Sequence, residues 1–212
     1  MMKEKSKLIL IFIILVMIVL FIFTYQENIK LNSYLEEDNS NRISGVFARL
    51  SSIHEYFDKN NKVEEFEESD LSWIGLCTIE CSNDIHNLYR QSRYLNDENY
   101  LNHEKINRVQ KFLNSTSKYI SMDILNTVGN HYPLLYSKGT VDLSEDDISN
   151  IEVIDAIFEE IDKYIINEFA SDSENSRKYR IDYENNYVMN DIKKIINEIV
   201  RIFETYEDKI IF

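Results

Sequence analysis

Cys77 and Cys81 have the spacing in this chain that most readily suggests chemistry, because residues four apart share one face of a helix. Both fall on the apolar stripe set by Ile74, Ile85 and Leu88, so we expect two core thiols, since a buried cysteine behaves as a small hydrophobe. A disulfide is the alternative, although side chains one helical turn apart run side by side, a geometry strained for an S–S bond. A soft-metal site would need a third ligand, which is not evident nearby.

Two His-Glu dipeptides begin the H-E-x-x-H pattern of zinc hydrolases. In that pattern two histidines one turn apart hold the metal ion, and the glutamate activates water. The second histidine is replaced by Asp58 after His54-Glu55, and by Asn107 after His103-Glu104. We therefore expect two solvated helix faces, and a metal-dependent hydrolase of envelope material is only an alternative function.

Two acidic stretches, residues 64–70 and 142–147, could in principle attract calcium. Both lack the alternating oxygen ligands and central glycine of an EF-hand loop, so we expect them to be solvated helix starts. The chain has four glycines in all, with no phosphate-cradling glycine-rich loop and no G-x-S-x-G motif. The sequence therefore predicts no catalytic residue, no metal site and no cofactor.

One long loop stands out, from Gly129 to Gly139, and we set the limits of the main loop at residues 129–143. It contains the only proline and two of the four glycines. Loops held by a rigid scaffold often carry binding residues. The candidate interaction residues are therefore the aromatic and imidazole side chains around the proline: His131, Tyr132, Pro133 and Tyr136.

Five segments repeat apolar residues at steps of three and four, which predicts the helices that carry these side chains. They run from the N-terminal segment to about Asp58, from Leu71 to Leu95, from Ile106 to Ile124 after a cap signal at Asn96-Asp97, from Ile148 to Phe169 after a cap at Ser144, and from Val188 to Tyr206. The polar stretch Glu36–Arg42 fits either an exposed helix or a break. Repeats near 3.5 residues favour packing at shallow angles. The predicted fold class is all-α, with a single N-terminal transmembrane helix followed by an antiparallel four- or five-helix bundle.

The N-terminal segment carries sixteen consecutive apolar residues, Leu8 to Phe23. The charge-free run of residues 8–26 makes a helix of roughly 28 Å, about one hydrocarbon thickness. A cleaved signal peptide is an alternative, but residues 24–28 offer no small-x-small cleavage site, and a buried soluble helix is seldom apolar all round. We predict an uncleaved signal anchor whose membrane-facing residues include Leu8, Ile9, Phe12, Leu15, Ile18, Phe21, Phe23 and Tyr25.

The charges on the two sides of this run predict its orientation. Lys3, Lys5 and Lys7 precede it, and the residues after it lean acidic. By the positive-inside rule, residues 1–7 are a basic cytoplasmic N-terminus, residues 8–26 cross the cell membrane once, and residues 27–212 are an exported domain.

The charge of the chain limits its partners. The formal net charge is −14, and beyond residue 24 there are 20 Lys and Arg against 36 Asp and Glu. Such an acidic domain repels phosphates, so nucleic-acid binding is not expected. We expect a non-catalytic, membrane-tethered extracytoplasmic module for protein–protein interaction or ligand sensing, with another envelope protein or its own copy as partner. The amino-acid usage is typical of an AT-rich bacterial genome, and a structural or lysis-associated envelope tether of phage origin is the other alternative.

Overall fold

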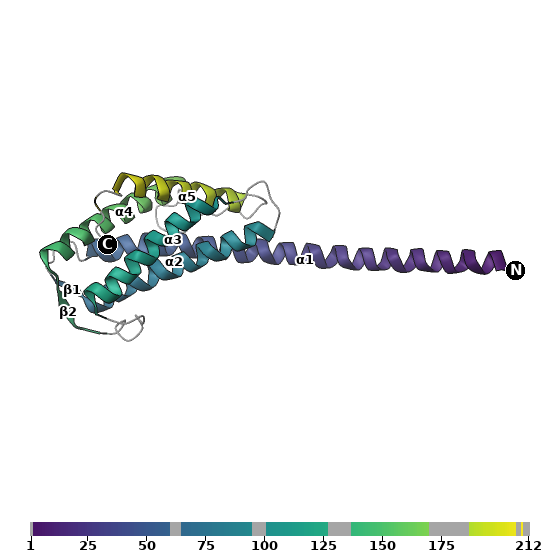
Figure 1. Ribbon diagram of the computed structural model, residues 1–212, viewed down its shortest axis with the longest axis horizontal. Helices are drawn as coiled ribbons and strands as arrows, with labels where there is room; N and C mark the ends of the chain where they lie inside the picture. The colour runs from purple at the N-terminus through teal and green to yellow at the C-terminus, as the bar shows by residue number, and fades with distance from the viewer. Residues whose placement is uncertain are drawn as a thin grey trace. The chain divides into compact units, whose positions relative to one another are not determined.

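The computed structural model describes residues 2–59, 65–94, 101–126, 137–169, 187–206 and 209. By its internal contacts the chain divides into two units, residues 1–38 and 39–212. The described residues are mostly helical (Figure 1). In chain order the elements are α1 (Met2–Lys59), β1 (Glu65–Glu67), α2 (Glu68–Tyr94), α3 (His103–Lys118), the π-helix η1 (Tyr119–Ile124), β2 (Thr140–Asp142), α4 (Glu145–Phe169) and α5 (Tyr187–Tyr206).

The first unit is the N-terminal part of α1. No glycine occurs before Gly45 and the only proline is Pro133, so nothing in the sequence interrupts the helix here. The helix also continues through Glu36–Arg42, so the stretch is helix and not a break, but Asn39 and Ser40 are buried there although an exposed helix was expected. Every side chain from Ile13 to Tyr34 is exposed.

The second unit has a hydrophobic core to which all five helices contribute. The apolar stripes expected from the 3-4 spacing are buried, and in α1 they comprise Ile43, Val46, Phe47, Leu50, Ile53 and Phe57. The helix α2 packs along α3, while α5 contacts both α3 and α4 (Figure 1). Within the described ranges, all five predicted helical segments are present.

The cap expected for the third helix is wrong. The helix α3 begins at His103, and its N-cap is Asn102, whose side chain accepts the backbone N–H of Lys105 at 3.1 Å. The residues Asn96-Asp97 lie outside the described chain. The expected cap of α4 is confirmed, because the Ser144 hydroxyl accepts the backbone N–H of Asp147 at 3.1 Å.

A small antiparallel sheet, which the all-α prediction did not include, accompanies the helices. It pairs β1 with β2 so that Phe66 lies opposite Val141. Residues 65–67 were expected to begin a helix and residues 140–142 to belong to a loop. They form strands because Phe66 alternates with two glutamates and is buried against Phe57, with ring centroids 6.2 Å apart.

The helix expected up to Ile124 changes its winding near the end. Its last six residues, Tyr119–Ile124, form η1 rather than an α-helix. The Tyr119 hydroxyl donates to Asp147 at 2.7 Å, which ties the start of this segment to the first turn of α4.

Candidate functional site

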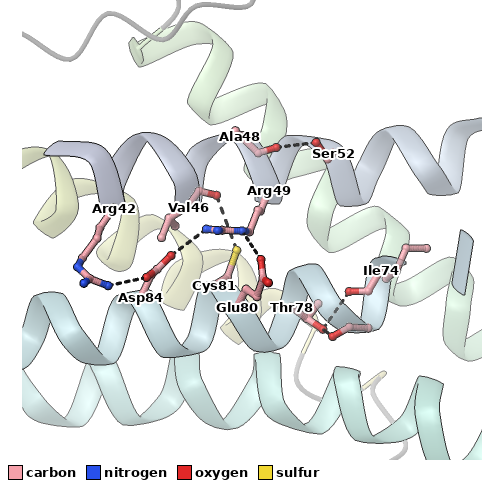
Figure 2. Close-up of polar contacts among 11 residues, drawn as sticks. Arg42, Val46, Ala48, Arg49, Ser52, Ile74, Thr78, Glu80, Cys81 and Asp84 are labelled. Atoms are coloured by element: carbon pink, nitrogen blue, oxygen red, sulfur yellow. Dashed lines mark hydrogen bonds and ion pairs between the residues drawn. The ribbon is translucent and has the colours of Figure 1, made fainter. Parts of the chain in front are cut away.

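A cluster of ion pairs joins α1 to α2 in the second unit (Figure 2). Asp84 lies between two arginines: Arg42 donates to its Oδ1 at 3.0 Å and Arg49 to its Oδ2 at 2.8 Å. The Nε atom of Arg49 also lies 2.8 Å from Glu80 Oε2. The positions increase along α1 as they decrease along α2, so the two helices run antiparallel where they touch.

These ion pairs are partly shielded from water, which increases their contribution to the stability of the fold. The Asp84 side chain is 18% exposed, and those of Arg42 and Arg49 are 31% and 30% exposed. Solvated ion pairs contribute little to stability, but a partly buried carboxylate that receives two guanidinium groups is costly to remove. With two positive and two negative groups, the cluster is balanced in charge and acts as a clamp between the helices.

The two cysteines lie on the core side of this clamp. Cys81 is fully buried, with its Sγ 3.8 Å from the carbonyl oxygen of Val46, and both thiols are free. Burial raises the pKa of the Cys77 thiol to about 11 and that of Cys81 well above its ordinary range. Nucleophilic attack and metal binding both need the thiolate. At neutral pH the pair therefore packs as two small apolar groups.

The contact between α1 and α2 continues away from the clamp with an aromatic pair and an ion pair. Tyr56 stacks on Trp73 with ring centroids 6.5 Å apart, and Lys59 donates to Asp70 at 2.9 Å. Asp70 was expected to be solvated with the other acidic residues of 64–70, but it is only 4% exposed. The sequence did contain a signal for this burial. Asp70 lies three residues before Trp73 and seven before Cys77, which places the three residues on the same face of α2.

The two His-Glu pairs lie on different helices, and their histidines differ in burial and in the residues they contact. His54 on α1 lies 3.0 Å from Asp155 on α4, in a half-buried contact, so the expected solvated face is wrong for this residue. Burial raises the pKa of Asp155, and the contact with His54 opposes that rise. His103 is exposed, stacks on Tyr89 and contacts Asn107. Among the described residues no group of three or more His, Cys, Asp or Glu side chains could hold a metal ion.

The candidate interaction residues His131, Tyr132, Pro133 and Tyr136 lie outside the described chain. The end of their loop is described and closes onto α2. The Ser137 hydroxyl donates to the Glu68 carboxylate, and the Glu68 backbone N–H donates to the Gly139 carbonyl at 2.9 Å. A Cβ at position 139 would come within 2.6 Å of the Glu68 carboxylate, so a larger residue there would require the Glu68 side chain to move.

The residues expected to face a membrane divide into two sets. The backbone is helical at Leu8, Ile9 and Phe12, whose side chains are outside the described set. The others are exposed: Leu15 55%, Ile18 49%, Phe21 72%, Phe23 62% and Tyr25 59%. Among the described residues, one helix is long and apolar enough to cross a membrane, judged by length and composition.

Comparison with protein-family models, curated proteins and solved structures found no match for this chain. Its function must therefore be argued from its own residues.

Proposed function

We propose that the chain is a single-pass membrane protein in which residues 8–26 tether an acidic helical module, and that the module binds a protein partner without chemistry of its own. The partner is another protein of the cell envelope or a second copy of the chain. The observation that supports the proposal most is the exposure of the apolar N-terminal helix. No described part of the chain covers these side chains, whose exposed fractions range from 42% at Val16 to 72% at Phe21.

A lipid bilayer is the environment that suits this segment best. Burying one Leu, Ile or Phe side chain is worth about 1.5–3 kcal/mol, and such residues surround the helix on all sides here. A helix that is apolar all round belongs in hydrocarbon or in the middle of a large core. Lys3, Lys5 and Lys7 would then remain in the cytoplasm, and the acidic second unit would lie on the far side.

The second unit suits a binding role on the far side of the membrane. We propose that its five helices form an antiparallel bundle, an arrangement supported by their shared core and by the reversed register of α1 and α2. Its thiols are protonated and buried, and His54 and His103 contact residues of the chain itself. These features favour a module that acts by contact.

The tether is tested by paired substitutions that match in exposure but differ in position. Ile18→Lys with Phe21→Lys places two charges in the proposed hydrocarbon segment, where each costs roughly 2.5–3.5 kcal/mol. The control is Ile29→Lys with Tyr34→Lys, whose parent side chains are 52% and 67% exposed, against 49% and 72% for the test pair. We expect the first pair to release protein from carbonate-washed membranes and the control to be retained like the parent chain. Equal retention of both variants would contradict the tether.

Partner binding is tested separately, on the full chain in native membranes solubilised with a mild detergent. A second protein, or a second copy, should be recovered in a fixed ratio and should dissociate at high salt if it contacts the acidic surface. Repeated recovery of the chain as a monomer would contradict the binding role.

A further inference from the structure

The helix α3 is basic although the module that contains it is acidic. Beyond residue 24 the chain carries 20 Lys and Arg against 36 Asp and Glu, whereas α3 carries four Lys and Arg against the single Glu104. Two of these lysines, Lys111 and Lys118, are exposed and lie seven residues apart, on the same side of the helix. Asn114 is exposed between them, and we call these three residues the lysine face.

The two lysines of this face are not engaged by the chain around them. Within the part of the chain that the structure describes, neither Lys111 nor Lys118 has a carboxylate partner. Arg108 on the same helix, by contrast, pairs with Glu204 on α5 at 2.8 Å. The lysine face therefore presents two ammonium groups that an acidic surface would complement.

The helix α4 presents a face of the opposite charge. It carries nine Asp and Glu against the single Lys163. Glu145 and Glu152 are exposed and also lie seven residues apart, and neither has a basic partner among the described residues. Ser149 is exposed between them, and we call these three residues the glutamate face.

The two faces match in spacing as well as in charge. Residues seven apart are separated by roughly 10.5 Å along a helix axis, so both lysines meet both glutamates when two such helices lie side by side. The residue between the charges is short on each face, Asn114 on one and Ser149 on the other, which allows the helices to approach closely. Such matched charges set both the register and the choice of partner.

Exposed apolar side chains near the lysine face add contact area to the charges. Met122 follows Lys118 by one turn and is 40% exposed. Ile79 on α2 is 38% exposed, and the Ser117 hydroxyl donates to the carbonyl of Gly75, one turn before Ile79, at 2.9 Å. The surface therefore combines charge with apolar area, as protein interfaces do.

We propose that the partner of the module is a second copy of this chain, with the lysine face of one copy against the glutamate face of the other. None of these four described charged side chains pairs with another within one copy, so a second copy is needed to bring them together. The inference rests on the proposed function, in which the partner is an envelope protein or a second copy, and it selects the second copy. Exposed ion pairs contribute little each, but two copies tethered in one bilayer have a high effective concentration, so a weak interface suffices.

The test measures energy transfer between copies of the full chain that carry a donor or an acceptor fluorescent protein at the C-terminus. Both are reconstituted in phosphatidylcholine vesicles at a low protein-to-lipid ratio, because this lipid has no net charge to compete with the faces. We expect transfer that an excess of unlabelled parent chain abolishes and that falls at high salt.

Charge reversal on each face provides the decisive variants. Lys111→Glu with Lys118→Glu places like charges opposite each other, and so does Glu145→Lys with Glu152→Lys. Each double variant alone should associate roughly tenfold or more weakly than the parent chain. A mixture of the two variants should recover the parent level, because every lysine face then meets a glutamate face again.

A third double variant controls for net charge. Arg90→Glu with Lys194→Glu changes the charge of the chain as much as the lysine-face variant does, at exposed positions on α2 and α5. It should associate as the parent chain does, and circular dichroism checks that all variants are folded.

Four results would overturn the proposal. They are the absence of transfer between parent copies, reversed variants that associate like the parent, a mixture as weak as its components, and an equal loss in the control. Flotation of the vesicles reports the tether separately, since a chain without an anchor does not float. Recovery of a different protein in a fixed ratio, without transfer between copies, would leave the binding role standing and exclude the second copy.

Discussion

The two halves of α1 differ in the pattern and in the burial of their apolar residues. From Ile13 to Phe23 every residue is apolar and exposed, without any stripe. From Ile43 to Phe57 the apolar residues recur every three or four positions and are buried, while Arg49 carries a charge between them. The difference teaches that the pattern of apolar residues, more than their number, indicates what a helix packs against.

The largest expected effect comes from truncating a leucine in the buried half. Leu50 is 0% exposed, so Leu50→Ala should lower the free energy of unfolding of the second unit by about 2–5 kcal/mol. Leu20 is 59% exposed in the other half, and Leu20→Ala should leave that free energy unchanged. Urea denaturation in nanodiscs, followed by the fluorescence of the single Trp73, measures both variants. Equal losses would show that the two halves are not distinct.

A smaller effect on the free energy of unfolding should appear at alkaline pH, because Cys77 on α2 is buried in the same core as the second half of α1. Burial raises the pKa of Cys77 from 9.0 to about 11, so the folded chain retains a proton that the unfolded chain releases. Its contribution to stability is therefore complete below pH 9 and is lost as pH rises towards 11, with a slope of up to about 1.4 kcal/mol per pH unit.

The comparison that isolates this slope is Cys77→Ala. Urea denaturation between pH 8 and 11 should show a steeper fall for the parent chain than for the variant, whatever the difference at pH 8. Parallel curves would mean that Cys77 titrates normally in the folded chain.

Removing one carboxylate from the clamp should have a still smaller effect. Asp84→Asn leaves Arg42 and Arg49 half-buried without their shared partner, and should cost about 1–2 kcal/mol of unfolding free energy. The control is Glu27→Gln, which breaks the exposed pair with Lys30 in the first unit, where the side chains are 55% and 75% exposed. That change should fall within error. A cost for Asp84→Asn no larger than for the control would show that the clamp contributes nothing.

The sequence could predict the helices because their signal is long and repeated. The isoleucine stripe of α4, from Ile151 to Ile165, spans four turns, and no local alternative fits it. The strands β1 and β2 were missed because each has three residues, too few for an alternating pattern to be noticed. The cap of α3 was misplaced because Asn96, Asp97 and Asn102 are all good capping residues.

The contacts of the site were beyond prediction for a different reason. Arg42 and Asp84 are 42 residues apart. Most charged residues of a helix lie on its solvated face, so sequence spacing alone does not indicate which of them form ion pairs. The contact of His54 with Asp155 depends on how α1 meets α4, which also lies outside any local pattern. The hydrogen bond from Tyr119 on η1 to Asp147 on α4 likewise joins separate elements, so no local pattern could predict it.

The proposed tether is tested most directly by the accessibility of the second unit in intact cells. Protease added to spheroplasts should remove the mass beyond residue 26 while a cytoplasmic marker protein survives, and the N-terminal fragment should remain in the membrane pellet. A second unit that resists digestion until the cells are lysed would contradict the proposed orientation, and a chain that washes from the membranes without detergent would contradict the anchor itself.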